Sequence, residues 1–162
     1  MKSMDYLASI IQKISDWPLT DIKLEEQNKE YEATTFSLAN RSFRSRRGKK
    51  TTKKLGYFVV FWEKDAELKN KPYDFYSAPD KLIVTIFDEN KIGQFIFPKK
   101  LLAEKNILNY GKNKGKMALR VYPDWVTGLN KIASTTQKWQ SPFFIDLTNN
   151  WDLQLLKKLY FS

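Results

Sequence analysis

Two strand-like runs separated by only three residues constrain the fold of this chain more than any other feature. Residues 81–87 and 91–97 are rich in β-branched and aromatic side chains, and Asp88-Glu89-Asn90 lies between them. Such residues favour a pleated, half-buried surface, and so short a connection is typical of a hairpin. The two runs therefore predict an antiparallel hairpin within a central sheet.

The rest of the chain alternates between helical and strand-like patterns. Apolar residues at helical spacing predict a first helix that Ser3 can cap and that ends at 16–18, a helix at about 129–140 and a final helix capped by Asn149 or Asn150. Strands are expected at 31–38, near Phe43, and at 55–62, 117–122 and 143–147, with a short helix after Pro98; residues 20–30, 63–80 and 106–116 are predicted as loops or fraying helix.

This order of elements indicates a mixed α/β fold with a single central mixed sheet flanked by helices. The length of 162 residues suits one ordinary domain, and no break in composition marks a second one, so we expect a single domain over 1–162.

The absence of two residue types excludes much familiar chemistry. The chain has no cysteine and no histidine, which excludes disulfides, thiolate metal sites, cysteine nucleophiles and the commonest general base. Neither a signal peptide nor a membrane-spanning run is visible, so a cytoplasmic protein without membrane insertion is expected.

The net charge of +10 is confined to two segments. Residues 41–54 carry +8 with no acidic residue, residues 98–120 carry +6, and the remainder sums to −4. One interpretation of 41–54 is a solvated, disordered arm, since like charges repel. The other is a surface that binds phosphates, for which the four arginines offer bidentate contacts.

We predict that the second interpretation holds and that the two segments form a nucleic-acid-binding surface. Its expected members are Arg41, Arg44, Arg46, Arg47, Lys49, Lys50, Lys53, Lys54, Lys99, Lys100, Lys112, Lys114, Lys116 and Arg120. This requires that the fold place the two segments on one face. It also treats the arginines of 41–47 as exposed side chains whose replacement spares the core. The glycines at 111 and 115 lack Walker spacing, so this loop predicts no nucleotide cradle.

Several segments, in order, resemble one family. They are residues 31–38, 56–62, 72–74, 93–99, 120–125 and 136–140, among them Gly93-Gln94-Phe95-Ile96-Phe97-Pro98-Lys99 and Thr136-Gln137-Lys138-Trp139-Gln140. The set is similar to the MepB family of small cytoplasmic proteins, named for a place beside a multidrug efflux pump and its repressor. The family has no established enzymatic activity. The resemblance implies an architecture like that of restriction-endonuclease-like domains, and with it a nucleic-acid partner. Gly56-Tyr57 departs from the Gly-Gln that the family tends to have.

A nuclease of the restriction type needs a carboxylate and a Glu-x-Lys that share Mg²⁺. Asp80 and Glu89-Asn90-Lys91 match in letters, but they lie at opposite ends of a predicted strand, ~25–30 Å apart at ~3.3 Å per residue. No lysine stands at Gln94-Phe95-Ile96, where one is needed. We therefore predict no catalytic residue and no metal site.

The sequence thus predicts a non-catalytic protein that binds nucleic acid, duplex DNA in the first place, without a small-molecule cofactor. Two alternatives stay open: a Mg²⁺-dependent nuclease built on other carboxylates, and a basic module that contacts an acidic protein or membrane surface. The tryptophans, Trp139 among them, are expected to pack in the core rather than stack on bases.

Overall fold

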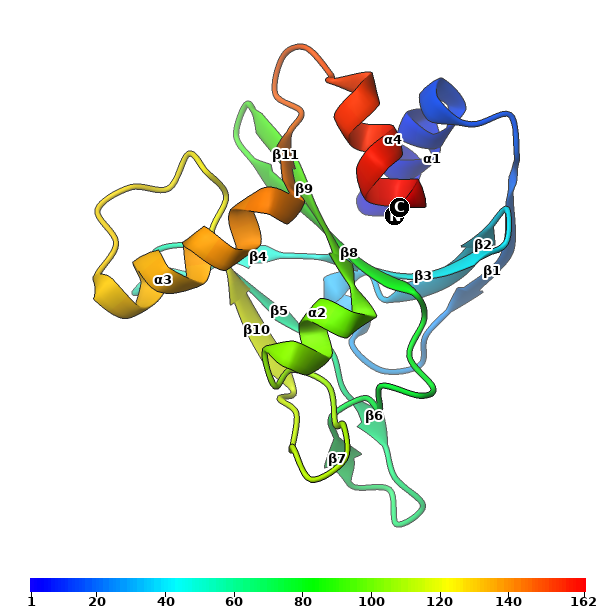
Figure 1. Ribbon diagram of the computed structural model, residues 1–162, viewed down its shortest axis with the longest axis vertical. Coiled ribbons are helices and arrows are strands. Elements are labelled where there is room, and N and C mark those ends of the chain that lie inside the picture. Colours follow the sequence, from blue (N-terminus) through cyan, green and yellow to red (C-terminus); the bar gives the residue numbers. More distant parts are fainter.

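The predicted hairpin forms the centre of the molecule. A computed structural model describes residues 1–162, and in it β8 (Lys81–Asp88) pairs antiparallel with β9 (Lys91–Pro98) along their whole length, from Lys81 opposite Pro98 to Asp88 opposite Lys91. Figure 1 shows the two long strands crossing the middle of the fold. The hairpin predicted from 81–97 is confirmed.

Four helices and eleven strands make up the chain. The helices are α1 (Lys2–Ile14), α2 (Lys99–Glu104), α3 (Lys131–Gln140) and α4 (Leu153–Phe161), with 3₁₀ turns at Lys29–Tyr31 and Ser141–Phe143. The remaining strands are β1 (Leu19–Leu24), β2 (Thr34–Leu38), β3 (Arg41–Arg47), β4 (Lys49–Lys50), β5 (Tyr57–Val60), β6 (Glu63–Lys64), β7 (Asn70–Lys71), β10 (Ala118–Val121) and β11 (Phe144–Asp146).

The strands form a six-stranded mixed sheet in the order β1-β2-β3-β8-β9-β11, in which only β3 and β8 run parallel. The predicted mixed α/β architecture with a central mixed sheet and flanking helices is confirmed. A second, three-stranded sheet, β10-β5-β4, and the short ribbon β6-β7 are additions that the sequence did not predict. The likeness to restriction-endonuclease-like domains stays a prediction.

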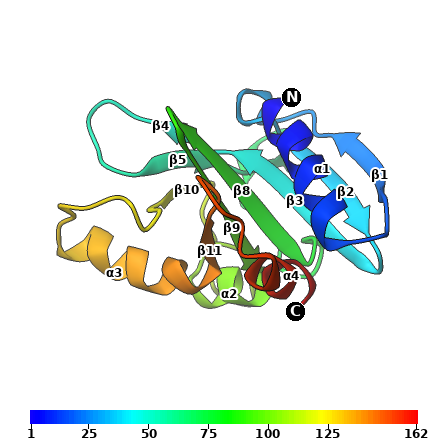
Figure 2. The same cartoon turned by 90° about the horizontal axis from the view of Figure 1, so that it is seen from above.

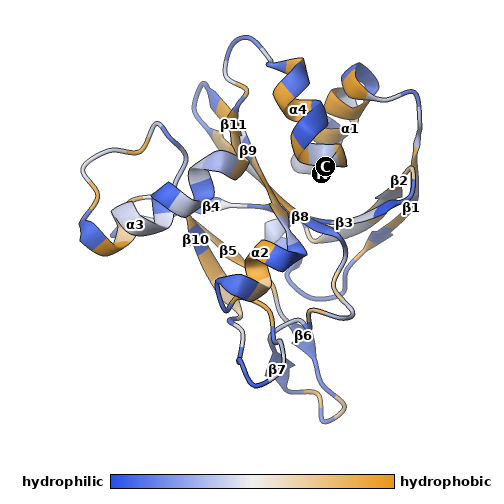
Figure 3. Cartoon of the chain, viewed as in Figure 1, coloured by the Kyte–Doolittle hydropathy of each residue, from blue (hydrophilic) through white to orange (hydrophobic).

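Both faces of β8 and β9 are covered, which explains their almost uninterrupted apolar sequence. On one face α1 and α4 pack over Phe43, Ile83 and Ile96. On the other face Val84 and Phe97 belong to a core with the three-stranded sheet and α2. Figure 3 shows hydrophobic residues concentrated along these central strands, and none of the helices is both long and apolar enough to cross a bilayer.

Three predictions of local structure were wrong. Residues 20–30 were expected as loop or fraying helix, but residues 20–24 belong to the edge strand β1; most of its side chains are exposed, so no apolar periodicity marks it. The basic stretch 41–50, expected to be a connection with one short strand at Phe43, is the interior strand β3 followed by β4. The final helix is capped by Asp152, which accepts a hydrogen bond from the Leu155 N–H (3.1 Å), rather than by Asn149 or Asn150.

Candidate nucleic-acid interface

The basic segment 41–54 divides into two parts, the arginines of β3 and the lysines that follow β3. The side chains of β3 alternate between the two covered faces of the sheet. The most enclosed of its cations is Arg46, which is 0% exposed. Its guanidinium donates to both carboxylate oxygens of Glu25 (2.9 and 3.2 Å), to Asn28 Oδ1 (3.0 Å) and to the Val60 carbonyl (3.1 Å). A buried charge is tolerated only when it is paired and hydrogen-bonded, and Arg46 meets that condition.

Glu25 is the acceptor that holds this cluster together. Burial raises the pKa of the Glu25 carboxyl, but the hydrogen bonds and charge of Arg46, with the charge of Arg44, outweigh burial and lower that pKa to about 2. The Arg44 Nε donates to the same carboxylate (3.0 Å), and its guanidinium lies 3.6 Å from the centre of the Tyr73 ring. Tyr73 in turn donates to Glu25 (2.7 Å).

The other two arginines of β3 are engaged on the helix-covered side. Arg41 donates to the Phe161 carbonyl at the end of α4, and Arg47 donates to Glu32 (3.1 Å). Burial raises the pKa of the Glu32 carboxyl, but hydrogen bonds from Ser3 and Arg47 lower it by more, so the net shift of this pKa is downward. The expectation that these four arginines are exposed is therefore wrong. Arg46 is buried, and Arg41, Arg44 and Arg47 are half-buried and already hydrogen-bonded within the fold.

The lysines that follow β3 differ, because they lie on β4 and on the β4–β5 connection at the edge of the small sheet. Lys49, Lys50, Lys53 and Lys54 are all exposed, and of these only Lys50 makes an ion pair, with Asp88 (3.3 Å). This part of the predicted surface is open to an anionic ligand.

The second basic segment meets these lysines through Arg120 on β10. The Arg120 Nη1 donates to Thr51 Oγ1 (2.9 Å) and to the Leu55 carbonyl (3.2 Å) of the β4–β5 connection. The condition that the two segments share one face is thus met for Arg120. Lys116, four residues earlier, lines a cavity together with Arg120. Lys99 and Lys100 instead begin α2, and Lys112 and Lys114 lie on the protruding loop before β10.

Three adjoining cavities form a cleft, and Arg120 lines two of them. Viewed from above in Figure 2, the β4–β5 connection and the segment leading into α3 project to the same side of the molecule. The cavity between them has a volume of about 570 Å³ and is lined by Lys53, Lys54 and Leu55 on one side and by residues 128–130, 132 and 133 on the other, with Arg120 between. It shares Arg120 and Tyr122 with a cavity of about 240 Å³, and Lys53–Leu55 with one of about 450 Å³. We call the three together the basic cleft.

The lining of the basic cleft is strongly cationic. Its charged residues are Lys50, Lys53, Lys54, Lys105, Lys116, Arg120 and Asp88. Asp88, the one acid, is bound by Lys50 and accepts a hydrogen bond from Tyr57 (2.5 Å), whose hydroxyl also accepts one from Trp125 (3.1 Å). Burial and the bond to Asp88 raise the pKa of Tyr57 to about 12. Clefts lined by one sign of charge raise the local concentration of the opposite ion.

Sequence reasoning missed some of the residues that line this region. Lys105 was counted in the charge but not in the predicted surface, and it lines the cleft beside Trp139. On the outer face of the small sheet, Lys49 and Arg120 both lie opposite Phe58, and Arg120 lies 5.6 Å from the centre of that ring. No sequence signal marked this face, because the four residues of β5 are all apolar although the structure buries only every second one.

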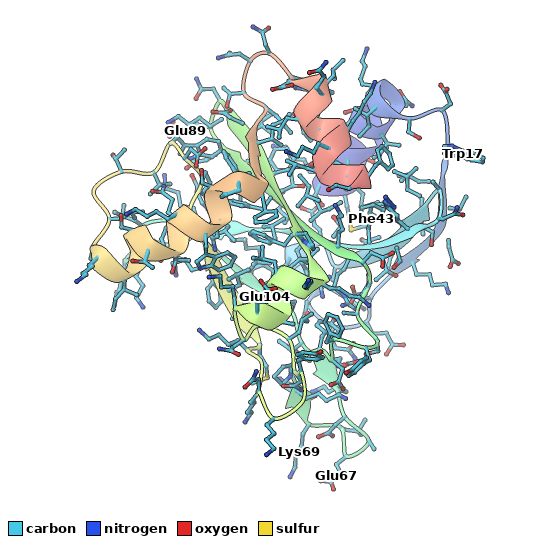
Figure 4. The ribbon with its side chains drawn as sticks, in the orientation of Figure 1. Trp17, Phe43, Glu67, Lys69, Glu89 and Glu104 are labelled. Atoms are coloured by element: carbon cyan, nitrogen blue, oxygen red, sulfur yellow. The ribbon has the colours of Figure 1, made fainter.

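The carboxylates do not gather into a metal-binding group. No three acidic side chains lie close enough together to hold a metal ion. Asp80 precedes the eight-residue β8 and Glu89 follows it, which separates them by roughly 30 Å. Figure 4 places Glu89 at the turn of the hairpin. Asp80 accepts hydrogen bonds from the Ser42 N–H (2.9 Å) and hydroxyl (3.2 Å) at the other end.

Comparison with known proteins identifies one family. The model of the MepB-like family matches residues 25–146, which include β2 to β11 and the whole basic cleft. The crystal structure of MepB is 43% identical to this chain over 93% of its residues and 99% of the solved chain, with a TM-score of 0.82. No curated protein matches the chain.

Proposed function

This chain belongs to the MepB-like family, as its motifs predicted, and from that premise we propose that it is a non-catalytic protein that binds nucleic acid through the basic cleft, duplex DNA in the first place. The cleft lies inside the part of the chain that the family model matches, whereas α1 and α4 lie outside it. We therefore seek the function in the cleft rather than under the helices.

The observation that carries the proposal is the contact of Arg120 with Thr51 and Leu55, because it joins the two basic segments into one surface. Lys53, Lys54 and Lys116 beside it are exposed, and none of them has an acidic partner. Free lysines that neutralise phosphates release condensed counterions, which favours binding without requiring any base contact. The surface is thus suited to hold a phosphate backbone irrespective of sequence.

Two features support the non-catalytic part of the proposal. Asp80 and Glu89 are held at opposite ends of β8, and the Asp80 carboxylate is already occupied by Ser42. The basic cleft contains a single carboxylate, Asp88, whose oxygen is bound by Tyr57 and Lys50. Phosphodiester hydrolysis assisted by Mg²⁺ needs several oxygen ligands at one point, and these positions do not supply them.

The test is the salt dependence of binding to generic duplex, measured by fluorescence anisotropy. The logarithm of the affinity should fall with the logarithm of the salt concentration by about 0.9 per phosphate contacted. The triple variant Lys53→Gln/Lys54→Gln/Lys116→Gln should bind more weakly on every sequence and have a slope shallower by up to about 2.7. Incubation with Mg²⁺ or Mn²⁺ should leave plasmid and linear duplex uncut.

A matched control removes three exposed lysines from the helix-covered half. Lys13→Gln/Lys157→Gln/Lys158→Gln gives the same change in net charge on α1 and α4, away from the cleft. If both triple variants weaken binding equally, the effect is one of net charge, and the basic cleft is not the binding surface. Cleavage of duplex by the native chain would overturn the non-catalytic part.

A further inference from the structure

Three aromatic rings lie together outside the basic cleft, where the segment after β7 meets the loop between α2 and β10; those of Tyr76 and Tyr110 are exposed, and that of Phe75 is half-buried. The ring centroids of Phe75 and Tyr76 are 5.3 Å apart, those of Phe75 and Tyr110 4.7 Å, and those of Tyr76 and Tyr110 5.7 Å. Tyr76 is 77% exposed and Tyr110 42%. Aromatic surface left in water at one place is uncommon and marks a contact site more often than scattered exposed residues do.

The backbone holds this aromatic cluster in place. The Phe75 N–H donates to the Asn109 carbonyl (2.9 Å), and the Asn109 N–H donates to the Tyr73 carbonyl (2.8 Å). The Asn109 side chain accepts from the Gly115 N–H (2.6 Å), which closes the loop that carries Tyr110. A side chain at Gly115 would lie 2.4 Å from the Ile107 carbonyl oxygen, so glycine is required at this close approach. The rings are therefore pre-positioned, which lowers the entropic cost of binding.

The surroundings of the aromatic cluster are cationic. Lys99 Nζ lies 4.9 Å from the centre of the Phe75 ring, and Lys112 and Lys114 are exposed in the loop that follows Tyr110. Asp74, the adjacent acid, is paired with Lys71 (3.8 Å). The same loop ends at Lys116, whose N–H bonds to the Ile107 carbonyl (2.9 Å) and whose side chain lines the basic cleft.

We propose that the aromatic cluster stacks unpaired nucleobases of a nucleic acid whose backbone lies on these lysines. This inference rests on the proposed function and extends it from duplex to single-stranded segments or frayed ends. Aromatic rings stack on any base, because every base has a π-face, and a basic rim attracts the phosphates between the bases. Paired bases inside a duplex cannot reach the rings. The aromatic cluster therefore binds single-stranded segments, and the basic cleft binds duplex.

The experiment compares a short oligothymidylate with a duplex of the same length in anisotropy titrations. Tyr76→Ala/Tyr110→Ala should weaken binding of the single strand about tenfold, from base stacking that alanine removes, and change duplex affinity by less than about twofold. Tyr76→Phe/Tyr110→Phe keeps the rings and should bind the single strand like the native chain. Trp17→Ala, which removes an exposed ring (66%) that Figure 4 shows at the edge of the fold away from the β6–β7 ribbon, serves as the control.

Each result is decisive. If the alanine variant binds the oligothymidylate as tightly as the native chain while both still bind duplex, the inference is overturned and the proposed function stands. If the phenylalanine variant loses as much affinity as the alanine variant, hydroxyl contacts rather than stacking are responsible, and the inference is likewise overturned. If the native chain binds neither ligand, both proposals fail. Ultraviolet crosslinking of the oligothymidylate to peptides containing Tyr76 or Tyr110 would support the assignment directly.

Discussion

The two halves of the basic segment 41–54 differ in what their charges contact. The arginines of β3 lie in a strand covered on both faces, where Arg46 is paired with Glu25 and Arg47 with Glu32. The lysines of β4 and of the connection after it lie at the edge of the small sheet, where Lys53 and Lys54 have no partner. The positive charges of this one segment therefore fall into two groups: the arginines of β3 stabilise the fold, and the lysines after β3 are available to a ligand.

The chemistry of the side chains matches this division. The guanidinium of Arg46 presents donors in a rigid fork, which suits bidentate pairing with a carboxylate and fixed acceptors such as Asn28. Lysine carries a compact, strongly hydrated charge on a flexible stem and is retained in water at small cost. The four arginines that favoured phosphate binding in the sequence are thus the residues least available for it.

The two halves of segment 41–54 should differ most in their contribution to the free energy of unfolding. Arg46→Gln leaves the Glu25 carboxylate buried without its bidentate partner and should lower the free energy of unfolding by about 3–5 kcal/mol. Lys53→Gln, a change of the same charge in the other half, should stay within about 0.5 kcal/mol. Urea denaturation followed by circular dichroism measures both. A loss below about 1 kcal/mol in Arg46→Gln would show that the two halves do not differ in this way.

The next effect is the pH dependence of stability. The pKa of Glu25 is about 2 in the folded chain, below its value in the unfolded chain. The stability that this carboxylate contributes, on the order of 3 kcal/mol, is present at neutral pH, and it is lost as the pH falls from about 4.5 towards 2. Denaturation at pH 7 and at pH 3 should therefore show a gap between the native chain and Glu25→Gln that narrows in acid.

The control for this measurement is Glu30→Gln, because Glu30 is exposed. The gap between the native chain and this variant should be small at both pH values. A gap for Glu25→Gln that stays constant between pH 7 and pH 3 would contradict the assignment of the low pKa to Glu25.

A smaller effect, of opposite sign, is expected in the cleft. Asp88→Asn removes the one carboxylate of the basic cleft, frees Lys50, and keeps an acceptor for the Tyr57 hydroxyl. Affinity for duplex should therefore rise, by roughly threefold at low salt and less at high salt, since partly screened surface charges contribute about 0.5–1 kcal/mol. Asp16→Asn, an exposed acid after α1, should leave the affinity nearly unchanged. An unchanged or lower affinity in Asp88→Asn would place the ligand elsewhere.

The smallest effect separates two lysines of the same cleft. Lys50 already pairs with Asp88, whereas Lys53 is unpaired, so Lys50→Gln should cost about half as much binding free energy as Lys53→Gln. Both variants should melt within about 2 °C of the native chain. Titrations of the two variants side by side at low salt measure the difference. Equal losses of binding free energy would mean that the ion pair with Asp88 does not reduce the contribution of Lys50 to binding.

Local sequence was enough for the regular elements that a distinct apolar pattern marks. The β-branched and aromatic runs of β8 and β9, the apolar stripe of α1 and the short helix after Pro98 were all predicted at nearly their observed positions. Edge strand β1 was missed because its side chains are mostly in water and carry no period. The three-stranded sheet was missed because its pairing joins β10 to β5 across a long stretch of chain, and no local pattern encodes that contact.

What the sequence by itself determined is the composition of the chemistry: no thiol, no imidazole, two basic segments and a central hairpin. Which charges remain free was decided by tertiary structure alone. Arg46 meets Glu25 across 21 residues, Arg47 meets Glu32 across 15, and Arg120 meets Thr51 across 69. The physical reason is that the availability of a charge depends on the solvent and the counter-charges around it, and folding supplies both from distant parts of the chain.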